Sequence, residues 1–140
     1  MTDTDVIRAI PTEIFNKGRL DLIDKYIAED FTEHAAVPPG FPAGREGFRV
    51  YVEQLRSAFP DFQLDVTGQY QDGDTYILRG RCSGTMTGDF MGMPAANKKA
   101  TWDEIDIVRM GNGKVIEHWG VEDQLSMLQQ LGFAPPPSGT

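Results

Sequence analysis

Three stretches of the chain carry apolar residues every three or four positions, the spacing of a helix with one buried face. The first covers Asp5–Phe15, with Thr4 as a plausible N-cap. Pro11 should kink or divide this helix because proline has no backbone N–H to donate. The second covers Leu20–Ile27 and the third Arg45–Ala58. The pattern therefore predicts a helical hairpin followed by one longer helix.

The remaining ordered segments alternate apolar and polar residues, as half-buried strands do. A short strand is predicted before the third helix, and four strands and a short helix after it. Glycine and asparagine at residues 111–113 tolerate positive φ and predict a tight hairpin. The predicted strands are Phe31–Ala36, one beginning at Phe62, Thr75–Met86, Lys98–Met110 and Val115–Trp119, and the terminal helix is Asp123–Leu131.

Helices grouped ahead of an antiparallel meander indicate the α+β class. We expect a cone-shaped α+β barrel, in which the N-terminal helices cover the concave face of a strongly curved, mixed, mainly antiparallel sheet. The mouth of such a cone is a pocket. At 140 residues the chain has the size of one domain, predicted to span residues 1–134, with a disordered tail at residues 135–140.

Charge and composition limit the classes of molecule that the protein can bind. The formal net charge of -8, with 13 scattered basic residues, argues against nucleic acid and anionic membrane surfaces, and no apolar run reaches a membrane span. The acidic first residues are unlike a signal peptide, so a cytoplasmic location is expected. The single cysteine, Cys82, excludes an internal disulfide and is interpreted as a core residue. A largely apolar small molecule is the expected ligand.

A set of motifs, in order along about 125 residues, resembles the SnoaL-like polyketide cyclases of the nuclear transport factor 2-like superfamily. The segments are Phe15-Asn16-Lys17-Gly18, Phe31-Thr32-Glu33-His34, Gly44-Arg45-Glu46-Gly47, Leu55-Arg56-Ser57-Ala58-Phe59-Pro60-Asp61, Gly84-Thr85-Met86, Gly92-Met93-Pro94, Gly113-Lys114-Val115-Ile116-Glu117-His118-Trp119, and Met127-Leu128-Gln129-Gln130-Leu131-Gly132. Two positions depart from the pattern: Met86 stands where many relatives carry histidine, and Pro94–Lys98 replaces a usual Pro-Pro-Thr-Gly-Lys.

The resemblance implies an intramolecular aldol condensation that closes a ring of an aromatic polyketide without a metal or cofactor. Such a reaction needs a base for a proton beside a carbonyl and a donor for the enolate. Asp123 is the first candidate, because it matches an aspartate of the family's Trp-x-x-x-Asp motif; alternatively it only caps the terminal helix. His34, at the end of the first strand, is the second candidate, with an exposed or carboxylate-bound histidine as the alternative.

The strand that contains Trp102 offers a third candidate. Trp102, Glu104 and Asp106 fall on one face, opposite Ile105 and its neighbours. If the face with the carboxylates lines the cone, burial would suit Glu104 to acid/base work. If Ile105 and Ile107 face the core instead, the carboxylates are solvated. On the last strand, alternation puts His118 and Trp119 on opposite faces, so His118 points outward if Trp119 points into the pocket.

Aromatic and thioether side chains suit a flat, hydrophobic, polycyclic substrate with carbonyl groups. The predicted substrate-binding residues are Phe41, Tyr51, Met86, Phe90, Met91, Trp102, Asp106 and Trp119. No metal-ligand spacing is found. The interpretation is a cofactor-independent cyclase; an epoxide hydrolase, isomerase or hydroxylase-like enzyme, or a non-catalytic ligand-binding module, are the alternatives on the same fold. A homodimer is expected, because the outer face of the sheet needs cover.

Overall fold

A computed structural model of the protein describes residues 1–138. Its first helix, α1 (Asp3–Ala9), is capped by Thr2 rather than by the predicted Thr4. The Thr2 hydroxyl accepts from the Asp5 N–H, and the Asp5 carboxylate accepts from the Thr2 N–H, which forms a capping box. The helix then widens into the π-helical turn η1 (Ile10–Phe15) at Pro11. The predicted division of this helix at Pro11 is confirmed.

The next segments match the predicted hairpin and long helix with shifted strand bounds. The predicted second helix is a short 3₁₀ turn followed by a single α-helical turn, and α3 has the predicted bounds. The first strand begins four residues earlier than predicted and ends three residues earlier. These elements are η2 (Leu20–Leu22), α2 (Ile23–Tyr26), β1 (Ile27–Glu33) and α3 (Arg45–Ala58).

One five-stranded sheet, in the order β1-β5-β4-β3-β2, forms the body of the molecule. The later strands are β2 (Gln63–Asp72), β3 (Thr75–Thr85), β4 (Lys99–Gly111) and β5 (Lys114–Glu122), which pair antiparallel, whereas β1 runs parallel to β5. Asn112 (φ 51°) and Gly113 (φ 78°) make the predicted tight turn between β4 and β5. The helix α4 (Gln124–Leu131) packs against the first residues of β4, where Gln130 bonds to Thr101.

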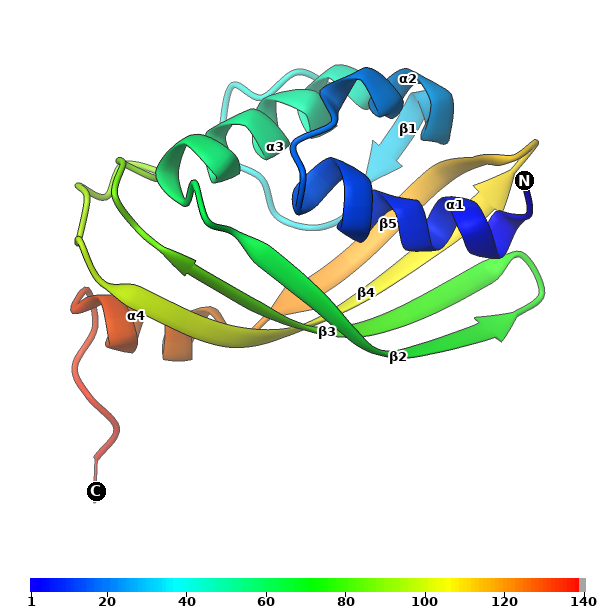
Figure 1. The fold of residues 1–140 in the computed structure, drawn as a ribbon. Helices are drawn as coiled ribbons and strands as arrows, with labels where there is room; N and C mark the ends of the chain where they lie inside the picture. The colour runs from blue at the N-terminus through cyan, green and yellow to red at the C-terminus, as the bar shows by residue number, and fades with distance from the viewer. Residues whose placement is uncertain (139–140) are drawn as a thin grey trace.

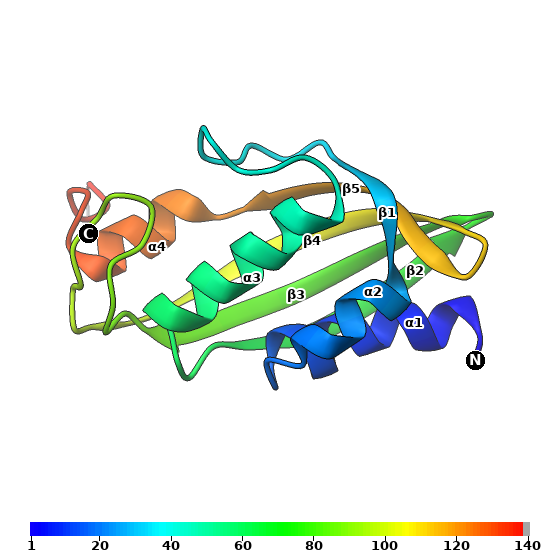
Figure 2. The same ribbon diagram turned by 90° about the horizontal axis from the view of Figure 1, so that it is seen from above.

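The sheet curves, and α1, η1 and α3 lie over one of its faces (Figure 1). Seen from above, α3 lies over the middle of the sheet, α1 and α2 lie beside it toward β2, and the 34–44 loop extends beside α3 (Figure 2). The predicted α+β cone, with N-terminal helices over the concave face, is confirmed. At the β2 edge, the Asn16 amide donates to the Leu64 carbonyl (3.0 Å) and accepts from the Leu64 N–H (2.7 Å), which joins η1 to β2.

The direction of the β4 side chains decides what lines the interior. Ala100, Trp102, Val108 and Met110 are buried, so Glu104 and Asp106, which share their parity, also point inward. Ile105 lies on the outer face with 45% of its surface exposed. The sequence alternative that placed Ile105 and Ile107 toward the core is therefore wrong, because four apolar residues of the other parity fix the strand.

The other described features concern Cys82 and the C-terminal residues. Cys82 is fully buried in the cluster around Phe59 and Trp102, as interpreted from sequence. Residues 135–138 form no helix or strand, and the last two residues of the predicted tail lie outside the described residues. Within residues 1–138, no helix is long and apolar enough to cross a membrane.

Candidate active site

A cavity of about 1160 Å³ lies between the inner face of the sheet, α3, η1 and the 34–44 loop. Most of its lining is apolar, including Phe15, Phe48, Leu78 and Phe90. Its size lies above the usual range for pockets that hold small organic ligands. One wall is different, because β4 and β5 place a row of ionisable side chains there.

His118 of β5 lies at the centre of this row, between two carboxylates. Its Nδ1 atom is 2.6 Å from Glu33 Oε1 of β1, and its Nε2 atom is 2.8 Å from Asp106 Oδ1 of β4. The side chains of His118 and Asp106 keep 23% and 19% of their area accessible, and both line the cavity. A ligand in the cavity can therefore reach the pair.

Strand register and one glycine bring these groups together. Glu33 pairs with His118 across β1 and β5, and Asp106 pairs with Gly120 across β4 and β5. A Cβ atom on Gly120 would lie 2.8 Å from His118 Cε1 and 2.9 Å from Asp106 Oδ1. Glycine at this position thus leaves the space through which the imidazole reaches Asp106. The Glu33 carboxylate is held in turn by the Ala35 N–H, at 3.0 Å.

The charges of this row are set by burial and by its internal hydrogen bonds. Burial lowers the tendency of His118 to be charged, but its bonds to Asp106 and Glu33 outweigh this and raise its pKa to about 9. Burial also opposes ionisation of Asp106, yet hydrogen bonds from Glu104 and His118 lower the pKa of Asp106. At neutral pH, a protonated His118 therefore lies between two carboxylates.

Glu104 is the uncharged member of the row. Burial, the hydrogen bond to Asp106 and the nearby negative charge raise the pKa of Glu104 to about 10. Its Oε1 atom also accepts from the Cys82 thiol, at 2.9 Å. Glu104 and Asp106, two residues apart on one strand face, thus have pKa values displaced in opposite directions, an arrangement that separates an acid from a base.

A second polar group lies farther along the same wall. Tyr51 of α3 reaches Glu122 of β5, with its hydroxyl 3.5 Å from Oε1. Glu122 is exposed as a whole residue, but it lines the cavity, and burial together with the charge of Asp106 raises the pKa of its carboxyl group. The indole N–H of Trp102 lacks a well-formed hydrogen bond, although its proximity lowers the pKa of Glu122.

The family follows from comparison with known proteins. Residues 5–131 match the family described as SnoaL-like polyketide cyclase. This chain belongs to that family. The cyclase interpretation is therefore confirmed over the hydrolase, hydroxylase-like and non-catalytic alternatives.

Individual relatives agree with this family. Aklanonic acid methyl ester cyclase DauD of Streptomyces sp. (strain C5) is 27% identical over 138 residues, 96% of this chain and 85% of DauD. Nogalonic acid methyl ester cyclase of Streptomyces nogalater is 27% identical over 124 residues, 84% of this chain and 89% of that enzyme. The crystal structure of IdmH from Streptomyces antibioticus is 31% identical with a TM-score of 0.80, covering 94% of this chain and 99% of IdmH.

Seven of the residues predicted from sequence lie on the cavity wall of this SnoaL-like protein. They come from the 34–44 loop, α3, the loop before β4, and β4 itself. They are Phe41, Tyr51, Phe90, Met91, Trp102, Glu104 and Asp106. The role of each in binding or catalysis stays a prediction.

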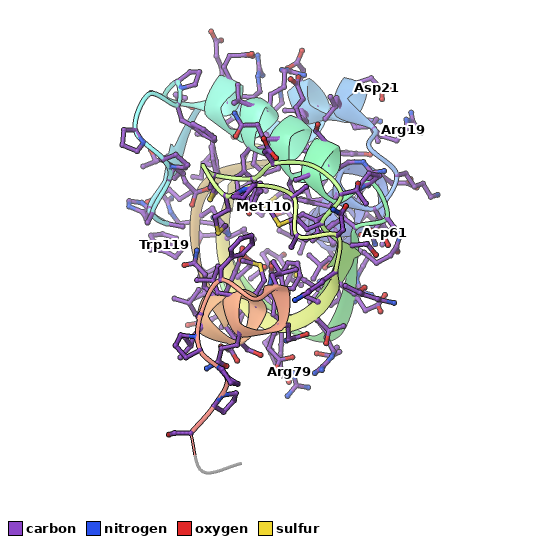
Figure 3. The ribbon with its side chains drawn as sticks, turned by 90° about the vertical axis from the view of Figure 1, so that its left-hand side faces the viewer. Arg19, Asp21, Asp61, Arg79, Met110 and Trp119 are labelled. Atoms are coloured by element: carbon purple, nitrogen blue, oxygen red, sulfur yellow. The ribbon has the colours of Figure 1, made fainter. Side chains whose placement is uncertain are left out.

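The other four predicted site residues lie away from the cavity. Asp123 caps α4, with its carboxylate accepting from the Ser126 N–H, so the alternative of a helix cap describes its position. His34 stacks on Trp119 outside the sheet, with ring centroids 4.6 Å apart. Figure 3 shows Trp119 pointing away from the interior, while Met110 points into it. The orientation that placed Trp119 in the pocket is wrong, because β5 turns His118 inward instead.

Sequence reasoning missed His118, Glu33 and Glu122 as cavity residues. His118 was weighed as a catalytic residue only in the event that Trp119 pointed outward. Glu33 sits beside His34, so choosing His34 for the pocket excluded Glu33. Alternation along β5 could not have found His118 and Glu122: the buried Val115 would turn residues 117 and 119 inward, but a register shift before residue 117 reverses the two faces.

Met86, the last of the four, is fully buried against Phe59 and Trp102 rather than exposed to the cavity. The family histidine would thus meet an apolar cluster in this chain. We expect Met86→His to lower the free energy of unfolding by about 2–4 kcal/mol without a gain in activity, because it buries a polar ring with no partner. Urea unfolding followed by circular dichroism measures this. An active Met86→His variant of unchanged stability would contradict the placement.

Proposed function

We propose that this cyclase closes a ring of a hydrophobic, polycyclic polyketide ester by intramolecular aldol addition. The observation that carries the proposal is Asp106, a low-pKa carboxylate on the wall of a largely apolar cavity, next to two proton donors. The reaction moves one proton and forms one carbon–carbon bond, so no oxidant or reductant is consumed. The relatives named above support the substrate class, since both are methyl ester cyclases.

In this proposal, Asp106 takes the proton from the carbon between two carbonyl groups. The enolate so formed attacks a ketone carbonyl of the same molecule, and the resulting alkoxide takes up a proton. Glu104, which is protonated at neutral pH, is positioned to donate to the developing oxyanion, as a neutral carboxylic acid does in other enolising sites. Glu104, having given its proton to the alkoxide, then takes up the proton that Asp106 received, because the two carboxyl groups are hydrogen-bonded to each other, and the row returns to its starting state.

His118 holds Asp106 in its ionised form and in its place on the wall. The imidazolium lies between Glu33 and Asp106, so its charge is balanced on both sides. Tyr51 adds a neutral hydroxyl, because burial raises its pKa well above the ordinary value. Its long contact with Glu122 leaves that hydroxyl free to turn to a ligand carbonyl. Phe41 and Met91 supply the apolar contacts expected for a flat ring system.

The charge of the wall supports an ester rather than a free acid. Glu29, Asp30, Glu33, Asp106 and Glu122 line the cavity, and no lysine or arginine is among the described residues that do so. The imidazolium of His118 is already paired with Glu33 and Asp106, so a substrate carboxylate would find no unpaired cation there and would lie close to negative side chains. A neutral ester avoids this repulsion.

The test compares a tricyclic polyketide methyl ester with its free acid. We expect ring closure of the ester, and a kcat/KM for the acid at least about tenfold lower, corresponding to about 1.4 kcal/mol of repulsion. Chromatography of the product measures both rates, and calorimetry measures binding. Tight binding of the ester without ring closure would contradict the proposed reaction, and equal turnover of the acid would contradict the charge argument.

A second copy of the chain is the proposed cover for the outer face of the sheet. Ile77, Ile107 and Trp119 form one row across β3, β4 and β5, and Ile105 and Val121 form the next. Ile105 and Val121 expose 45% and 70% of their surface. Such an apolar stripe is typical of a protein contact. The cytoplasmic location stays a prediction.

A further inference from the structure

The opposite side of the β1–β5 pair carries a cluster that the reaction does not use. The His34 imidazole stacks on Trp119 at an interplanar angle of 7°, and its Nε2 atom is 2.7 Å from Glu117 Oε2. Arg109 of β4 donates to the other oxygen of Glu117. We call His34, Trp119, Glu117 and Arg109 the outer clamp. It joins three strands on the face away from the cavity.

The outer clamp and the catalytic row are built on adjacent residues. Glu33 points inward to His118, and His34, the next residue, points outward to Trp119 and Glu117. The His34 N–H also donates to the His118 carbonyl, at 2.9 Å. Any movement of His34 relative to β5 is therefore transmitted to Glu33 through one peptide unit.

The backbone gives this part of β1 little other support. β1 pairs with β5 at Ile27, loses register, and pairs again only at Thr32 and Glu33. Beyond Glu33 the chain enters the 34–44 loop, which has no helix or strand before α3. Apart from Phe31, which packs on Phe48 of α3, the end of β1 is thus held by its two paired residues, the Glu33–His118 contact, the His34 N–H and the side chains of the clamp.

We propose that His34 and Trp119 are positioning residues, which hold the end of β1 against β5 and so keep the Glu33 carboxylate in contact with His118. This inference rests on the proposed function for its effect on the reaction, but not for its effect on His118. His118 faces Glu33 of β1 and Asp106 of β4, with Glu104 and Glu122 farther along the wall. His34 faces Glu117, which Arg109 also holds, and Asp74 lies beyond Arg109.

The experiment follows the pKa of His118 by NMR of the imidazole ring in the full chain. The sequence has two histidines, so His34→Ala leaves His118 as the single titrating ring. We expect the pKa of His118 to fall by about one pH unit in His34→Ala, because a loosened carboxylate contact stabilises the imidazolium less. His34→Phe, which keeps a ring on Trp119, should restore most of the loss. Glu33→Gln gives the effect of removing the carboxylate outright.

The matched control is Asp103→Asn, which breaks an ion pair with Arg81 (3.1 Å) on the same outer face but away from β1. Asp103→Asn should leave the pKa of His118 unchanged. In His34→Ala, by contrast, the pKa should fall and kcat of ring closure should drop about tenfold. An unchanged pKa of His118 in His34→Ala would overturn the proposal, whatever the activity. If the wild type closes no ring, the NMR result still decides it, so the two failures can be told apart.

Discussion

Asp106→Asn should reduce kcat for ring closure by about 10²- to 10⁴-fold, the range associated with removing a general base. Asparagine has nearly the same shape and can still accept from His118, so binding of the ester should change little. Because His118 keeps Glu33 as a partner, the imidazolium is not left without a counter-charge. Single-turnover kinetics on the methyl ester, with calorimetry for binding, separates the two effects.

The matched control is Asp123→Asn, which tests the aspartate that the family motif favours. Asparagine is as good a helix cap as aspartate, so α4 should stay intact. We expect near-normal kcat, because Asp123 accepts from Ser126 and lies outside the cavity lining. If Asp123→Asn lost activity while Asp106→Asn kept it, the base would have to be reassigned to the motif residue.

Glu104→Gln should make the protein more stable and less active. The amide cannot transfer a proton to the oxyanion, so kcat should fall by about 10²-fold. At pH 7 Glu104 must take up a proton when the chain folds, which costs free energy, and glutamine removes that cost, so the free energy of unfolding should rise by about 1–4 kcal/mol. Urea unfolding and ring closure measured on the same preparation test the two effects together. A variant that lost stability would show that protonating Glu104 does not cost the folded protein free energy at pH 7.

The pH dependence of the free energy of unfolding tests independently whether Glu104 destabilises the folded protein. The pKa of Glu104 is about 10 in the folded protein and 4.5 ordinarily, so the unfolded chain releases this proton first as pH rises. The contribution of Glu104 to folding stability must therefore decline between about pH 4.5 and 10. His118, whose pKa of about 9 lies above its ordinary 6.5, adds stability that is lost as pH rises through 9. Glu104→Gln should remove the loss of stability due to Glu104 and keep the loss due to His118.

Local patterns were sufficient for most of the fold. The bounds of α3 followed from its apolar spacing, and the turn at Asn112-Gly113 followed from residues that accept positive φ. Pro11 marked the break in the first helix, since a missing donor acts locally. The end of β1 was placed too late, because its partner is a parallel strand more than 80 residues away, and no local pattern reports such a pairing.

The site was less predictable, because it depends on strand parity in β4 and β5. The sequence placed Glu104 and Asp106 on the same strand face as Trp102. It could not decide whether that face or the one with the isoleucines points to the core. On β5, placing Trp119 in the pocket assigned the adjacent His118 to the outer face, so His118 was not predicted as a cavity residue. Met86 was placed by family pattern, whereas its burial comes from contacts with distant segments around Phe59. Packing between strands, rather than sequence spacing, decides these positions.

The contact between Asn16 and Leu64 bears on how the molecule avoids aggregation through the edge of its sheet. β2 is an edge strand, and an edge with free N–H and C=O groups invites intermolecular strand addition and aggregation. At Leu64 the amide of one side chain occupies both the donor and the acceptor. Farther along, Arg8 of α1 binds Gln69 of the same strand. The first helices thus cover the β2 edge of the sheet as well as the cavity. Truncating them would expose an aggregation-prone edge strand along with the pocket.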